Sequence, residues 1–267
     1  MRWPHSVFFW LLAALVIGFT QNALGLLMHE GSHYFFHHNK KASDLWCDAL
    51  VCLPIFNTVQ GYRTPHFEHH RCSGETTDPY FELYGEYPTR QHLIRCFLID
   101  CSGISAIQKF FKRQVCAGSG KLGMNNPTYA LPFFLLVQFL LWLLLFGVTG
   151  KWYAWLLLWV APLMTVAICL NRLRTIVEHY PGFQGIQVNR TSLTGWLEYL
   201  CIAPYGYGHH LEHHWLPQVP YYDLAFTHRF LAERFDFASN DVNSHGYLHT
   251  FRRLVHEIGE LEKSPRP

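Results

Sequence analysis

Histidine is the most informative residue type in this chain, because eighteen occur in 267 residues and eight of these fall into three short clusters. One cluster has the pattern His-x-x-x-His and the other two have the pattern His-x-x-His-His. They comprise His29 and His33; His66, His69 and His70; and His210, His213 and His214. Residues three or four apart lie on one face of a helix, so the imidazoles of a cluster can reach a shared metal ion.

The number and type of these candidate ligands indicate two metal ions. Imidazole binds zinc, copper, iron and nickel, and eight imidazoles are too many for one tetrahedral zinc ion. A zinc protease site is the rival interpretation of His29-Glu30-Gly31-Ser32-His33, but no hydrophobic protease helix follows it and the other clusters would have no role. Soluble di-iron bundles use Glu-x-x-His pairs, whereas the carboxylates here are not in that pattern. A histidine-rich di-iron site fits better.

Composition and apolar runs indicate an integral membrane protein. Half of the residues are hydrophobic, 15% are charged, and the net charge of +2 gives no argument for nucleic-acid binding. Three runs approach the roughly 20 apolar residues that a membrane-spanning helix needs: 6–28, 130–148 and 152–170. A cleaved signal peptide is the alternative for the first run, but cleavage there would cut into the first histidine cluster.

The predicted topology places all three clusters on the cytoplasmic side. Three crossings leave the amino terminus outside and residues 29–127 and 171–267 inside. Of 21 Lys and Arg residues, only Arg2 and Lys151 then lie outside, as the positive-inside rule expects. A histidine-rich metal transporter or sensor would need metal-binding residues inside the spans, and the sequence offers none there.

Two further segments are predicted to lie at the membrane surface. Leu45 to Val59 is apolar but short and contains Pro54, so we expect an interfacial or re-entrant helix and not a fourth crossing. A crossing there would put the first two clusters on opposite sides. Ile104 to Cys116 is either a basic helix on the membrane or an ordinary amphipathic helix of the cytosolic part.

The predicted fold is an all-α integral membrane protein forming a single domain over residues 1–267. It has about three transmembrane helices, interfacial helices and a cytosolic helical cap that carries the di-iron site. Apolar residues at helical spacing between Leu248 and Leu261 predict a packing helix in that cap. The eight cysteines form no Cys-x-x-Cys pair and are expected to be reduced packing residues.

The third cluster and its flanks resemble the membrane fatty acid desaturase superfamily. The resemblance is carried by residues 207–222, which read YGHHLEHHWLPQVPYY, and by Asp78-Pro79 after the second cluster, and it extends from about His29 to Leu224. It implies two iron ions, dioxygen as co-substrate and oxidation of an unactivated C–H bond in a lipid, foremost desaturation of a fatty acyl chain. A hydroxylase or ketolase of a hydrophobic substrate such as a carotenoid is the alternative.

The resemblance also implies one ligand outside the clusters. Members of the family have a further histidine between the last span and the third cluster, and His179 stands in the similar stretch, which makes it the ninth predicted ligand. Some members have an asparagine four residues earlier, where this chain has Thr175, so the resemblance does not extend to a water-mediated ligand at that position.

The other polar residues near the clusters are expected to support the ligands or to lie outside the site. Glu68 and Glu212 take the same place in their clusters and are expected to orient ligating imidazoles by accepting the free N–H. His37 and His38 are expected to lie outside the ligand set, and the role of His209 is open. The other histidines, including His228, have no partner spacing and are expected at the surface.

The reaction that the resemblance implies also requires partners. Each turnover needs two electrons, and the sequence has no Gly-x-Gly-x-x-Gly fingerprint and no fused haem domain. We therefore expect a separate electron donor, ferredoxin or cytochrome b5 with its reductase, in addition to a lipid or acyl substrate. The bacterial inner membrane and the endoplasmic reticulum are both compatible locations, with the active site on the cytoplasmic face.

Overall fold

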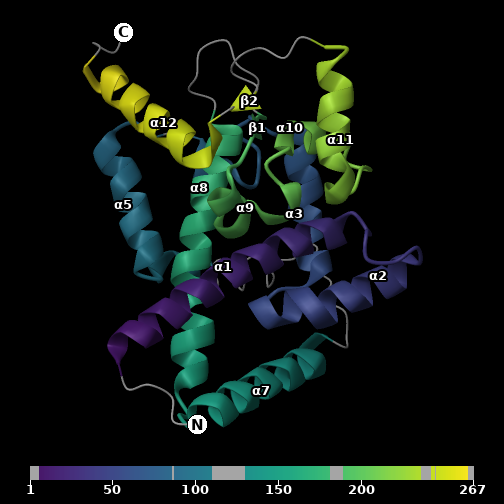
Figure 1. The fold of residues 1–267 in the computed structure, drawn as a ribbon, viewed down its shortest axis with the longest axis vertical. Helices are drawn as coiled ribbons and strands as arrows, with labels where there is room; N and C mark the ends of the chain where they lie inside the picture. The colour runs from purple at the N-terminus through teal and green to yellow at the C-terminus, as the bar shows by residue number, and fades with distance from the viewer. Residues whose placement is uncertain are drawn as a thin grey trace. The chain divides into compact units, whose positions relative to one another are not determined.

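The described part of the chain is almost wholly helical, as predicted (Figure 1). The computed structural model describes residues 6–85, 87–109, 130–180, 189–235, 242–243 and 245–263. One pair of two-residue parallel strands, β1 (Thr191–Ser192) and β2 (Val242–Asn243), accompanies the helices. The chain divides into two compact units, Met1–Pro65 with Asp100–Cys169 and His66–Ile99 with Leu170–Pro267. The single-domain organisation stays a prediction.

Three of the described helices are long and apolar enough to cross a membrane, which confirms the predicted number. They are α1 (Val7–Ser32), α7 (Ala130–Thr149) and the helical stretch Leu156–His179. The third differs from its predicted range, because it continues nine residues beyond Leu170. No glycine or proline interrupts residues 171–179, and six of these residues are buried within the protein, so the helix continues past the apolar run.

In the first unit, α1 packs against two π-helical turns of the third span, η3 (Leu156–Val160) and η4 (Leu163–Ala167). The amide of Gln21 donates a hydrogen bond of 2.7 Å to the carbonyl oxygen of Trp159 in η3. π-Helical turns disturb the regular hydrogen-bond ladder, and a carbonyl within a membrane needs a partner from the protein. The buried glutamine of α1 provides that partner.

The segment predicted as interfacial forms three short helices, α2 (Lys40–Cys47), η1 (Asp48–Cys52) and η2 (Leu53–Ile55). It is not among the candidate spans of the described residues, which agrees with the prediction that it does not cross. Gln138, the one strongly polar side chain of α7, donates to the carbonyl oxygens of Leu53 and Pro54 at 2.8 and 3.2 Å. The glutamine therefore satisfies backbone groups of a broken helix.

Of the basic segment 104–116, only residues 104–109 are described, and they are helical. The rest of this segment lies outside the described residues.

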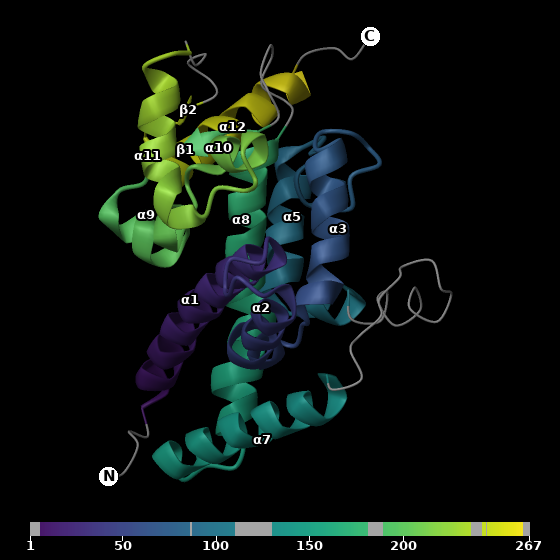
Figure 2. The ribbon, with the colours of Figure 1, turned by 90° about the vertical axis from the view of Figure 1, so that its right-hand side faces the viewer.

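The second unit contains shorter helices around a small aromatic core. Its helices, three of which (α3, α5 and α8) also extend into the first unit, are α3 (Val59–Cys72), α4 (Phe81–Tyr84), α5 (Arg90–Cys101), α8 (Ile168–His179), α9 (Trp196–Cys201), η5 (Pro204–Gly206), α10 (His210–Trp215), α11 (Tyr221–Ala232) and α12 (Gly246–Lys263). α12 is the predicted carboxyl-terminal packing helix, with Leu254 and Ile258 in the core beside Ile176 of α8. Both views show α10, α11, β1 and β2 grouped together within this unit (Figure 2).

Candidate metal centre

The second unit brings histidines from three helices to one point. α3 contributes His69, α8 ends at His179, and α10 contributes His210 and His214. One ligand atom of each of these four side chains lies within 4.8 Å of those of the others. This group unites residues from the second cluster, from the third cluster and from the stretch that only the family resemblance singled out.

The closest nitrogens in this group are better explained by a metal ion than by hydrogen bonds. The Nε2 atom of His210 lies 2.8 Å from Nε2 of His179 and 3.1 Å from Nε2 of His214. A ring nitrogen carries either one proton or one lone pair, so it forms one good hydrogen bond and not two. Two imidazole nitrogens at right angles around one ion, each about 2.1 Å from it, lie about 3.0 Å apart.

The electrostatics of the group also suit metal binding, because a ligating imidazole must be neutral. Burial lowers the pKa of His210 and of His214 well below the ordinary value, and the neighbouring histidines lower the pKa further. Both rings are therefore unprotonated at neutral pH.

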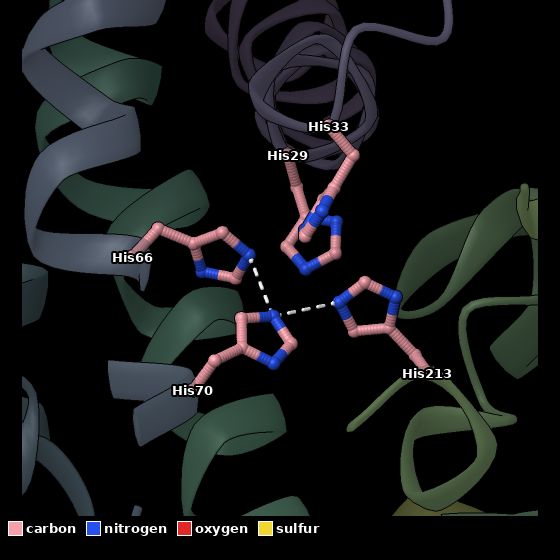
Figure 3. A group of neighbouring side chains, drawn as sticks. All are labelled: His29, His33, His66, His70 and His213. Atoms are coloured by element: carbon pink, nitrogen blue, oxygen red, sulfur yellow. Dashed lines mark hydrogen bonds between the residues drawn. The ribbon is translucent and has the colours of Figure 1, made fainter. Parts of the chain in front are cut away.

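A second group in the same unit consists of His66 and His70 from α3 and His213 from α10. Nε2 of His70 lies 3.0 Å from Nε2 of His66 and 3.0 Å from Nε2 of His213, and Figure 3 shows both neighbours directed at this atom. The same argument applies, because one ring nitrogen cannot serve two hydrogen bonds of this kind. The two groups together account for all seven predicted ligands of the second unit.

The first cluster lies at the end of α1 in the other unit. His29 is buried, its ring centroid is 5.4 Å from that of His33, and Figure 3 draws the two side by side on the end of this helix. Arg63 donates to the carbonyl oxygen of Ser32 at 2.7 Å and pairs with Asp44, which holds the helix end in place. Burial, followed by the charge of Arg63, lowers the pKa of His33 to about 4, so this imidazole is also neutral.

Asp78 serves the second cluster in the way that was expected of Glu68. Its carboxylate lies 2.6 Å from Nδ1 of His69 and also accepts a hydrogen bond from the hydroxyl of Tyr84. Nδ1 of His69 is thereby fixed as the donor, which leaves Nε2 as the ligand atom. The prediction for Glu68 is corrected, because this side chain is exposed and pairs with Arg71 on the next turn of α3.

Glu212 also has partners other than the predicted ones. Its buried carboxylate accepts hydrogen bonds from the hydroxyl of Thr191 and, at 2.6 Å, from Nδ1 of His228, which is not in either metal group. Burial alone would raise the pKa of Glu212, but the hydrogen bonds from His228 and Thr191 outweigh it and hold the pKa below the ordinary value. His228, expected at the surface, is instead largely buried against this carboxylate.

Sequence reasoning missed Glu178 altogether, although it directly precedes His179. One of its carboxylate oxygens lies 3.8 Å from Nε2 of His210. Arg174 pairs with the carboxylate at 3.0 Å, and the buried hydroxyl of Tyr247 donates to it at 2.6 Å. Arg174 precedes Glu178 by four residues on α8, which the sequence shows, but His210 and Tyr247 come from α10 and α12, so the spacing within the histidine stretch gave no signal for their contacts.

The residues whose roles were left open lie outside both metal groups. The rings of His37 and His38 are in contact, with centroids 3.9 Å apart, and Nδ1 of His37 accepts a hydrogen bond from the backbone N–H of Asn39. Nδ1 of His209 lies 3.0 Å from the carbonyl oxygen of Gly206, just before α10. Thr175 donates to the carbonyl oxygen four residues earlier in its own helix.

The comparison with protein families agrees with this geometry. The model of the Fatty acid desaturase family matches residues 5–244, which is most of the chain and includes all nine predicted histidine ligands. A comparison with curated proteins finds no match. Because the family match covers well over half of the chain and two histidine groups suited to metal ions accompany it, the chain belongs to the fatty acid desaturase family of membrane oxidoreductases.

Proposed function

We propose that this protein desaturates a lipid acyl chain with two iron ions held by nine histidines. Family membership supports fatty acyl desaturation, and the converging Nε2 atoms of the two histidine groups are the observation that carries the metal assignment. Iron is the metal we assign because the ligand set is rich in imidazole and the chain belongs to a family of non-haem di-iron oxidoreductases.

The proposed ligands divide into two sets. His69, His179, His210 and His214 hold one ion, and His66, His70 and His213 hold the other. We assign His29 and His33 to the second ion, because their i, i+4 spacing suits a shared metal and the His33 ring is neutral. When bound, the iron pair supplies the dioxygen activation that oxidation of an unactivated C–H bond requires.

The protein's own groups prepare the site for that chemistry. Asp78 fixes the tautomer of His69, and burial keeps the rings of His210 and His214 neutral. All seven ligands of the second unit are buried or partly buried, which limits the access of bulk water to the metal ions. These features favour binding of cations by neutral donors in a site of low dielectric.

The electron source and the membrane side complete the proposal. Because the sequence contains no flavin or nicotinamide fingerprint, we assign the two electrons per turnover to a separate ferredoxin or cytochrome b5. The excess of Lys and Arg on the predicted inner side supports a cytoplasmic site, in the bacterial inner membrane or the endoplasmic reticulum.

Lipid analysis tests the reaction. A desaturase-deficient host that expresses the protein is expected to gain lipids with new double bonds, as measured by mass spectrometry, and the His214→Ala variant is expected to yield none. His249→Ala is the matched control, because this exposed histidine of α12 lies in neither metal group. Oxygenated lipids without new double bonds would instead identify a hydroxylase or ketolase.

Metal analysis tests the cofactor separately. The purified protein is expected to contain about two iron ions per chain, and His214→Ala is expected to contain fewer while remaining in the membrane. A wild-type protein that carries another metal, or a His214→Ala variant with its full iron content, would contradict the assignment.

A further inference from the structure

We propose that His228 is a positioning residue of the metal centre, which orients the three ligands of α10 by holding the carboxylate of Glu212. His228 lies outside the histidine clusters, on α11, eighteen residues after His210. The inference rests on the proposed metal function. It concerns hydrogen bonds within the second unit, whose effect on metal binding can be measured with any suitable ion.

α10 needs support from its neighbours. It has only six residues, from His210 to Trp215, yet it carries His210, His213 and His214. A helix this short forms few internal hydrogen bonds and is not stable by itself. Its orientation therefore depends on the elements that it packs against, which include α11 and β1.

Glu212 connects α10 to both of these elements. One carboxylate oxygen accepts a hydrogen bond from the hydroxyl of Thr191 in β1. The other accepts a hydrogen bond of 2.6 Å from Nδ1 of His228 in α11. The Glu212 side chain is fully buried. Two bonds from different elements to the two oxygens of one carboxylate fix how far α10 is rotated about its axis.

That rotation determines where the ligands point. Each residue of an α-helix advances by about 100°, so Glu212 projects from nearly the opposite side of α10 to His210 and His214, each two residues away. Turning the carboxylate on one side of the helix therefore turns the imidazoles on the other. The Nε2 atom of His210 lies 2.8 Å from that of His179 and 3.1 Å from that of His214, so a small rotation of α10 changes how these nitrogens converge.

His228 is placed to act as a donor in this arrangement. Its side chain is 14% exposed, so most of the ring is held within the protein. The ring centroid lies 5.3 Å from that of His209, the residue that immediately precedes α10. Because ionised Glu212 only accepts hydrogen bonds, the contact requires the proton to be on Nδ1 of His228.

Two substitutions of similar size separate donation from packing. In His228→Asn the side-chain amide nitrogen is attached to Cγ, as Nδ1 is, so the donor to Glu212 is retained. In His228→Leu the donor is lost. His249→Ala, on the exposed side of α12, controls for the loss of a histidine elsewhere in the cap.

The experiment is a titration of the metal-free, full-length protein in lipid nanodiscs with Co²⁺, followed by the visible absorption of the bound ion. These bands report coordination geometry, and Co²⁺ occupies sites built for other divalent ions. We expect His228→Leu to bind Co²⁺ about 10- to 100-fold more weakly and with an altered spectrum, as for other residues that orient metal ligands. His228→Asn and His249→Ala are expected to resemble the wild type.

Other outcomes overturn the inference. A wild-type titration curve and spectrum for His228→Leu would do so, and so would equal losses in His228→Asn and His228→Leu, which would assign the effect to ring packing. Circular dichroism of the metal-free variants identifies any general loss of folding. A wild-type protein that binds neither Co²⁺ nor iron would contradict the proposed function itself.

Discussion

Asp78 is a single carboxylate on which two buried groups depend. His69 and the hydroxyl of Tyr84 both bond to it, and burial together with that bond raises the pKa of Tyr84. Asp78→Ala leaves the Nδ1–H of His69 without its acceptor and releases the ring from its fixed tautomer. We expect metal affinity to fall about 10- to 100-fold, as measured by competition with a chelator.

Glu68→Gln is the matched control for that substitution. Glu68 stands one position before His69 but is exposed and paired with Arg71, and exposed ion pairs contribute little to stability. We expect wild-type metal affinity in this variant. If Glu68→Gln lost as much affinity as Asp78→Ala, the carboxylate assignments at the second cluster would have to be exchanged.

The histidine spacing predicted which imidazoles come together better than it predicted the residues that support them. His66, His69, His70, His210, His213 and His214 could be chosen from local patterns, because ligands on one helix must follow its periodicity. The supports come from separate elements: Tyr247 reaches Glu178 from 69 residues away, and His228 reaches Glu212 from another helix. Such contacts exist only after tertiary packing, so spacing within a motif contains no information on them.

At the level of elements, the close approach of α1 and η4 depends on Gly18. A Cβ atom at this position would lie 2.5 Å from Cβ of Val166, which is closer than real side chains approach. Gly18→Ala is therefore expected to destabilise the protein by about 1–3 kcal/mol, through displacement of α1 from the third span. Thermal unfolding of the purified protein, followed by tryptophan fluorescence, measures this change.

Gly25, on the same helix, provides the control. A Cβ atom there would have nothing within 4 Å. Gly25→Ala should therefore leave the packing unchanged. Because alanine has a higher helix propensity than glycine, the free energy of unfolding should rise by up to about 1 kcal/mol. If both alanine variants unfolded at the same temperature, the tight contact at Gly18 would not contribute to holding these helices together.

The elements themselves were predictable to different degrees. Long apolar runs identified α1 and α7 closely, because a span must be about 20 residues long whatever it packs against. The end of the third span was not predictable from apolar runs, since residues 171–179 continue the helix with polar side chains that the protein buries beside apolar ones. The roles of Gln21 and Gln138 likewise depend on where the backbone ladder is broken.

At the level of the whole molecule, removal of the metal ions should weaken the fold as well as abolish activity. Seven imidazoles of the second unit lie in two close groups, and within each group the ligand atoms lie within 4.8 Å of one another. A ligand present at a thousand times its dissociation constant stabilises the native state by about 4 kcal/mol, so a chelator should lower the unfolding temperature. His214→Ala should respond less to the chelator, and an equal response would show that the stabilisation arises elsewhere.

The topology determines whether nine histidines can meet at all. If Leu45–Val59 does not cross the membrane, fusions of alkaline phosphatase after Lys40 and after Pro88 should both be inactive in a bacterial host, because the predicted topology then places both positions in the cytoplasm. A fusion after Lys151 should be active, and a fluorescent protein at the carboxyl end should fluoresce. The helical stretch formed by α2, η1 and η2 supports this arrangement, because it runs only from Lys40 to Ile55, contains Pro54 near its end, and is shorter than the roughly 20 residues that a crossing needs. Activity after Pro88 with none after Lys40 would place His29 and His66 on opposite surfaces, and no rearrangement of side chains could then bring them to one ion.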